Sequence, residues 1–114
     1  MRRIRLGAGI LNQTPLDWQG NAQRIRLALD AARQQSVQVL CLPELCLTGY
    51  GCEDMFLAPH VWETAWEQLQ QLIPHTTGLL VTLGLPLRVG NGVYNAVCVA
   101  VDGQIAGFVC KRHL

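Results

Sequence analysis

The first half of the chain alternates between strand-like and helix-like patterns of apolar residues. Apolar residues occupy every second position through most of Arg3–Leu11, which predicts a first strand. They then recur every three or four positions, which predicts a helix over Trp18–Gln35 with Asp17 as its N-cap. The largely apolar run Val37–Leu42 is typical of a strand buried on both faces. This order predicts a right-handed βαβ unit with two parallel strands.

The second half repeats the change from helical to strand periodicity. A helix is predicted from Pro59 or His60 to about Ile73, because apolar and aromatic residues again recur at helical spacing. Two turn signals, Asn91-Gly92 and Asp102-Gly103, then separate apolar segments. The sequence therefore predicts three more strands joined by tight turns: Gly78–Leu87, Val93–Val101 and Gln104–Cys110.

These elements predict an α/β fold with a mixed sheet and both helices on one face. The 114 residues suffice for one domain. Strands that are apolar on both faces need a second layer, so we expect another sheet, from further chain or from a partner chain, to cover the opposite face. The chain ends at Leu114, close behind an apolar strand, and we expect a truncated domain. The uncovered face and an open edge at Gln104–Cys110 lead us to expect a homo-oligomer.

Composition narrows the class of protein. Hydrophobic residues make up 50% and charged residues 15%, which excludes a disordered chain. The net charge of +1 gives no electrostatic footprint for nucleic acid. No apolar run approaches the roughly 20 residues of a membrane span, and the N-terminus lacks the apolar region of a signal peptide. We expect a cytoplasmic protein that binds neither nucleic acid nor membrane.

The cysteines and histidines do not predict a metal site or a disulfide framework. The chain has five cysteines and no secretory signal, so we expect reduced thiols. Four of them lie in apolar runs and are predicted to be buried core residues: Cys41, Cys46, Cys98 and Cys110. The cysteine spacing does not match a zinc site and the three histidines are scattered, so no metal is expected.

Two charged residues at the ends of apolar strands are the candidates for chemistry. Glu44 directly follows Pro43, where strand pairing should stop, and Lys111 follows the last apolar strand. The two side chains would meet at one rim of the sheet if their strands lay side by side and pointed the same way. Such a pair is either structural, although burying one is costly, or part of a functional site. The pattern alone leaves both interpretations open.

The residues around this pair resemble the nitrilase (carbon–nitrogen hydrolase) superfamily, in order and over essentially the whole chain. The resemblance is carried by Leu42-Pro43-Glu44-Leu45, Thr48-Gly49-Tyr50, Tyr94-Asn95-Ala96 and Cys110-Lys111-Arg112-His113-Leu114. It implies that residues 1–114 are the N-terminal portion of one domain, the first part of an α-β-β-α sandwich. Within the superfamily, the chain most resembles the amidase domain of glutamine-dependent NAD synthetases, through Gly49-Tyr50-Gly51-Cys52-Glu53-Asp54 and Gly84-Leu85-Pro86.

The resemblance also implies roles for individual residues. Family members use a Glu-Lys-Cys triad to hydrolyse a small amide such as glutamine. Glu44 would be the general base, Lys111 would hold the oxyanion of the tetrahedral intermediate, and Tyr50 would line the substrate pocket. The family's nucleophilic cysteine lies well beyond the lysine, so we expect no hydrolase activity from this chain alone. ATP and Mg²⁺ are expected only in a downstream synthetase domain that uses the ammonia for NAD biosynthesis.

Other interpretations remain at this point. Cys46 and Cys52 lie near Glu44, but neither has the strand-turn-helix context that exposes and activates a thiol. A different amidohydrolase of the same superfamily would use the same triad. A non-catalytic α/β structural module would use none of it.

Overall fold

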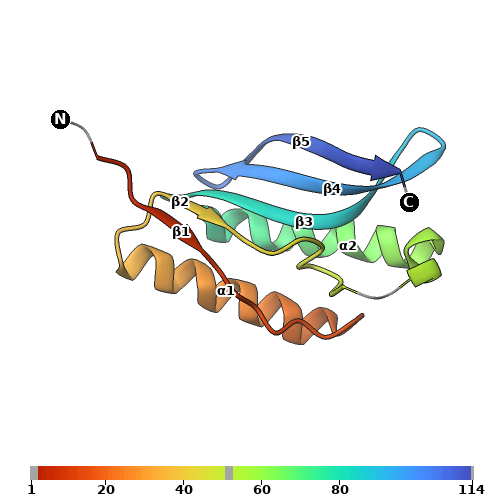
Figure 1. Cartoon of the computed structure of the whole chain (residues 1–114), viewed down its shortest axis with the longest axis horizontal. Helices are drawn as coiled ribbons and strands as arrows, with labels where there is room; N and C mark the ends of the chain where they lie inside the picture. Colours follow the sequence, from red (N-terminus) through yellow and green to blue (C-terminus); the bar gives the residue numbers. More distant parts are fainter. Residues whose placement is uncertain (1–2, 51–52, 114) are drawn as a thin grey trace.

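The computed structural model describes residues 3–50 and 53–113, and it contains the predicted α/β arrangement (Figure 1). In this part of the chain five strands form one sheet, and short 3₁₀ helices flank the second α-helix. In chain order the elements are β1 (Leu6–Ala8), α1 (Trp18–Gln34), β2 (Val39–Cys41), η1 (Glu53–Leu57), α2 (Pro59–Leu72), η2 (Ile73–Thr76), β3 (Leu80–Val89), β4 (Gly92–Val101) and β5 (Gln104–His113).

The sheet is mixed, as predicted, and its strands lie in sequence order from β1 to β5. Strands β1, β2 and β3 are parallel, whereas β3, β4 and β5 are antiparallel neighbours. Both α-helices lie against the same face of this sheet (Figure 1). The predicted parallel pairing of the first two strands around α1 is confirmed. No helix in the described part of the chain is long and apolar enough to cross a membrane.

The first helix begins and packs as the sequence predicted. The Asp17 carboxylate accepts a hydrogen bond from the Gly20 amide at 3.2 Å, which satisfies one of the unpaired N–H groups of the first turn. The apolar stripe of α1 is buried at Ile25, Leu29 and Ala32. In α2, Val61, Ala65 and Leu69 are buried in the same way, but Trp66 is partly exposed and its ring packs on Phe108 at a centroid distance of 6.0 Å. Trp66, although it shares the helical spacing of these residues, therefore lies at the border of the buried stripe.

Within the described residues, the α-helices cover one face of the sheet. Leu40, Val81, Leu83, Cys98 and Ala100 point toward the helices and form the core with them. The prediction that β2 is buried on both faces is not met, because Cys41 is exposed. Other apolar side chains of the sheet are also exposed, at Leu6, Val101, Ile105 and Val109. The described residues supply helices for one face and no layer for the other.

The strand limits and one turn differ from the prediction. The first strand covers only Leu6–Ala8, because only these residues pair with β2 and no other strand adjoins them. The hairpin loop is Gly90 and Asn91, one residue earlier than expected, since Gly92 already pairs with Val89. The turn at Asp102 and Gly103 is confirmed: both residues have positive φ, +50° and +81°, as a type I′ turn requires.

Candidate functional site

Glu44 lies at the start of a tight turn that follows β2. The backbone forms hydrogen-bonded turns over residues 44–48. Leu45 has a φ of +51°, in the left-handed region that residues other than glycine rarely adopt. Leu45 itself is fully buried against Phe56 and Val61. Such a conformation persists only where the surrounding structure holds it, and it is common at functional sites. Leu45, which directly follows Glu44, therefore has a strained backbone conformation.

This turn lies directly against β3 at Gly84. The Leu47 amide donates a hydrogen bond to the Gly84 carbonyl at 3.1 Å. A Cβ on Gly84 would overlap the backbone nitrogen of Leu45 and would lie 3.2 Å from the carbonyl carbon of Glu44. Glycine is thus required at this position because the backbone that carries Glu44 passes where a side chain would begin.

Lys111 lies at an irregularity in the last pair of strands. Ala96 of β4 pairs with Cys110, and Asn95 pairs with Arg112. Lys111 is therefore an extra residue in β5, opposite no residue of β4, and forms a β-bulge. A bulge breaks the strict alternation of side chains and redirects the extra residue. In this protein it re-aims the lysine that the sequence singled out.

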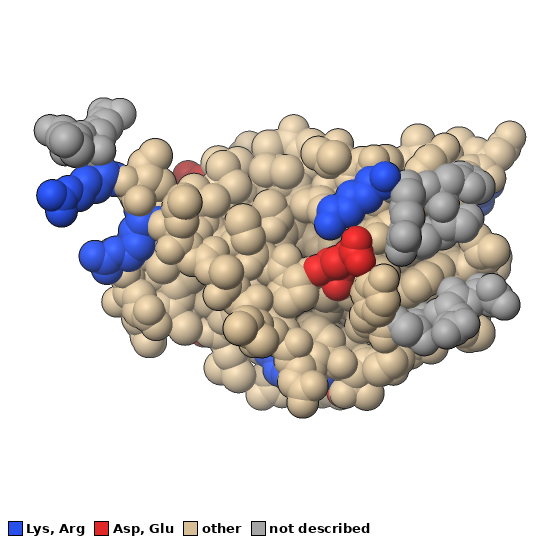
Figure 2. Space-filling model, viewed as in Figure 1, with Lys and Arg blue, Asp and Glu red and all other residues tan. Residues whose placement is uncertain are grey.

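The turn and the bulge bring the two predicted residues together. The Lys111 ammonium nitrogen lies 3.5 Å from Oε1 of Glu44, and the side chains are 44% and 34% exposed. The two side chains meet, and their strands point the same way as supposed. The strands do not lie side by side, because β3 and β4 lie between β2 and β5. In Figure 2 a basic and an acidic side chain touch near the middle of a largely uncharged face. A pair this exposed contributes only about 0–1 kcal/mol to stability.

Tyr50 ends the first described stretch of chain, six residues after Glu44. Its side chain is 60% exposed, so the phenol is accessible on the surface. Accessibility is compatible with the predicted contact to a substrate. The neighbouring Cys52 lies outside the described residues.

The four cysteine thiols that the structure describes divide into two groups. Cys46 and Cys98 are buried core residues, as predicted. Burial raises the pKa of the Cys46 thiol to about 12 and that of Cys98 to about 11, so both are protonated near neutral pH. Cys46 therefore lacks the thiolate that a nucleophile needs. The prediction of core burial is wrong for Cys41 and Cys110, which are exposed on the uncovered sheet face and on the edge strand.

Two polar features near the site were given no role in the sequence analysis. Asn95 is completely buried on the strand beside the Lys111 bulge, and neither atom of its amide has a hydrogen-bond partner among the described residues. The sequence signal for a special role of Asn95 was that it is a polar residue within an otherwise apolar strand. Asn21 is also fully buried, and it belongs to a polar cluster with Gln13 and Arg24 under the Glu44 turn. No spacing rule connects these residues with Glu44.

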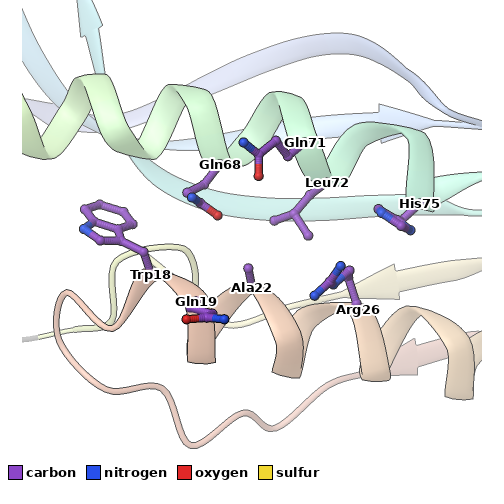
Figure 3. Close-up of a pocket in the computed structure, with 8 residues that line it drawn as sticks. All are labelled: Trp18, Gln19, Ala22, Arg26, Gln68, Gln71, Leu72 and His75. Atoms are coloured by element: carbon purple, nitrogen blue, oxygen red, sulfur yellow. The ribbon is translucent and has the colours of Figure 1, made fainter.

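A groove of about 230 Å³ lies between the two α-helices, away from the predicted site residues (Figure 3). Side chains of α1 and α2 face each other across it, and a histidine from η2 closes one end. The lining residues are Trp18, Gln19, Ala22, Arg26, Gln68, Gln71, Leu72 and His75. None of the predicted site residues belongs to this set, and we assign it no function.

The chain matches a known family over nearly its whole length. Residues 5–114 match the model of the family described as carbon–nitrogen hydrolase. Among curated relatives, the glutamine-dependent NAD(+) synthetase of Saccharomyces cerevisiae is 38% identical over 104 residues, which are 90% of this chain and 15% of that protein. The corresponding synthetase of Aquifex aeolicus is 34% identical over 112 residues, 96% of this chain and 19% of that protein.

Solved structures agree with this assignment. The chain resembles the crystal structure of a glutamine-dependent NAD(+) synthetase from Cytophaga hutchinsonii with a TM-score of 0.93 and 46% identity, covering 97% of this chain and 19% of that one. An amidase from Nesterenkonia sp. matches 95% of this chain, and 42% of its own, with a TM-score of 0.79 at 23% identity, which shows a shared fold. The chain thus spans less than a fifth of the synthetases described here, and the resemblance seen in the sequence is confirmed.

Proposed function

The chain belongs to the carbon–nitrogen hydrolase family, and from this premise we propose that it carries two of the three catalytic residues of a glutamine-hydrolysing amidase. Residues 1–114 would be the N-terminal portion of one such domain, in a protein that uses the released ammonia for NAD synthesis. The observation that carries the proposal is the approach of Lys111 to Glu44 at 3.5 Å on an accessible surface. The similarity to synthetases named as glutamine-dependent supports the choice of substrate.

The geometry suits a base beside a cation. Glu44 takes the proton of a cysteine thiol, and the thiolate attacks the carbonyl carbon of the glutamine side-chain amide. The Lys111 ammonium stabilises the negative oxygen of the tetrahedral intermediate. Glu44 returns the proton to the nitrogen as the C–N bond breaks, which leaves ammonia and a thioester. Water, deprotonated by Glu44, then hydrolyses the thioester to glutamate and the free thiol.

The nucleophile is proposed to come from sequence outside this chain, because the family resemblance implies a cysteine that lies well beyond the lysine. The Cys46 thiol is buried and its pKa is raised to about 12, which disfavours the thiolate. Tyr50, six residues after Glu44 and exposed, is proposed to contact the substrate. ATP and Mg²⁺ would act in a separate synthetase domain.

The proposal is tested by ammonia release from glutamine in the complete protein. Glu44→Gln removes the base and Lys111→Met removes the cation, so each is expected to reduce the rate by at least roughly 100-fold. Asp30→Asn is the control, since that carboxylate lies in an exposed ion pair with Arg33 on α1. We expect no ammonia from the 114-residue chain by itself. Full activity of the Glu44→Gln protein would refute the assignment.

A further inference from the structure

We propose that Gln13, Asn21 and Arg24 are positioning residues that hold the turn bearing Glu44; this inference rests on the proposed function. These three residues, called here the polar cluster, come from the loop before α1 and from the first turns of α1 itself. They contact neither Glu44 nor Lys111 through any hydrogen bond of the described residues. Their effect would be exerted through the backbone that follows Glu44.

The polar cluster binds consecutive carbonyl groups of that backbone. The Gln13 side-chain amide donates to the carbonyl of Cys46 at 2.7 Å, and the Asn21 amide donates to the carbonyl of Leu47 at 3.3 Å. The next carbonyl, of Thr48, accepts the backbone N–H of Leu16 at 2.7 Å. Three consecutive carbonyls therefore accept hydrogen bonds from donors within residues 13–21.

Arg24 and the backbone of Thr14 together fix which way the two amides face. The Thr14 N–H donates to Oδ1 of Asn21 at 3.0 Å, and the Asn21 amide nitrogen donates to the Thr14 carbonyl at 2.8 Å. The Nε of Arg24 donates to Oε1 of Gln13 at 2.7 Å, and its terminal NH₂ donates to Oδ1 of Asn21, also at 2.7 Å. A guanidinium group only donates, so it requires the oxygen of each amide on its own side. The amide nitrogens are then left to face the carbonyls of the turn. A lysine would not reproduce this fork, because its three N–H donors all radiate from one nitrogen.

The turn needs such support because of Leu45. This residue is in the left-handed region, with φ +51°, although it is a buried leucine. A strained conformation relaxes unless neighbouring contacts fix it. The polar cluster ties the residues after Leu45 to α1, whose Ile25 and Leu29 are buried in the main core. Relaxation of the turn would move Glu44 relative to Lys111, and catalysis is sensitive to small displacements of a catalytic group.

The test is the kinetics of glutamine hydrolysis by the complete protein carrying Gln13→Met, which keeps a side chain of similar length and removes its hydrogen bonds. We expect kcat to fall at least about 10-fold, while KM changes less than about 3-fold, because a displaced base weakens the transition state more than substrate binding. Arg24→Met is expected to show the same split. It serves as the second variant if Gln13→Met does not fold, since the Arg24 side chain is one-third exposed.

Arg33→Ala is the matched control. Arg33 also lies on α1 and donates to two backbone carbonyls, of His75 at 2.6 Å and Thr77 at 3.1 Å, but these belong to the region of η2. We expect this variant to lose thermal stability and to retain kcat. Parent-like kcat in Gln13→Met and Arg24→Met, or equal losses in all three variants, would overturn the inference. A Glu44→Gln protein is assayed alongside to distinguish failure of this inference from failure of the proposed function. If Glu44→Gln is inactive while Gln13→Met and Arg24→Met keep the parent kcat, only the inference about positioning fails. If Glu44→Gln is active, the proposed function fails.

Discussion

Replacing Gly84 with alanine tests whether the backbone of the Glu44 turn lies against β3. The new Cβ would overlap the nitrogen of Leu45, and ordinary contact begins at 3.4 Å, so the turn or the strand must move. Both are held by the hydrogen bond from Leu47 to the Gly84 carbonyl and by the buried neighbours Leu83 and Leu85. Overpacking of this kind costs about 1–3 kcal/mol. For a domain of this size that lowers the melting temperature by at least roughly 4 °C.

The same displacement should reduce activity in the complete protein. A shift of about 1 Å in a catalytic group costs roughly 100-fold in rate, so Gly84→Ala should release ammonia much more slowly. Stability is measured by chemical denaturation of the 114-residue chain, with a lower midpoint and an unchanged slope as the expected result. Activity is measured as ammonia release from glutamine.

Gly107→Ala is the matched control, because a Cβ on this β5 glycine would meet no atom within 4 Å. Alanine costs less conformational entropy than glycine in a strand, so this variant should be as stable as the parent or more stable by up to about 1 kcal/mol. If Gly84→Ala is as stable as Gly107→Ala, the close approach at Gly84 is refuted. If it is destabilised yet fully active, the link between this contact and the position of Glu44 is refuted.

Three further predictions concern single side chains. Glu44→Gln should change the unfolding free energy by no more than about 1 kcal/mol, because its ion pair is partly exposed; a larger loss in denaturation would favour a structural pair. Asn95→Leu should stabilise the 114-residue chain by about 1–3 kcal/mol, because it removes a buried amide without partners among the described residues; a lower midpoint would contradict this. Burial raises the pKa of Cys46 from 9.0 to about 12, so the folded state keeps a proton that the unfolded state loses. The unfolding free energy should therefore fall as pH rises from about 9 toward 12, and less so in Cys46→Ala.

Local patterns predicted the elements of this fold well. Three features depend on residues that are close together in sequence: the helix over Trp18–Gln34 with its Asp17 cap, the parallel βαβ unit and the tight turn at Asp102. The predictions were wrong where strand length and burial depend on which segments pack or pair with a strand. The first strand is short because β1 pairs only through Leu6–Ala8. Burial was overestimated at Cys41, because apolar sequence does not reveal whether a second layer is present in the chain.

The sequence by itself determined which residues are the candidates, because Glu44 and Lys111 each end an apolar strand segment and match a family pattern. Only the tertiary structure decided that they meet. Two strands separate β2 from β5, and the distance is closed by the turn against Gly84 and by the bulge at Lys111. Both depend on register and steric contact between distant segments, which no local pattern of residues specifies.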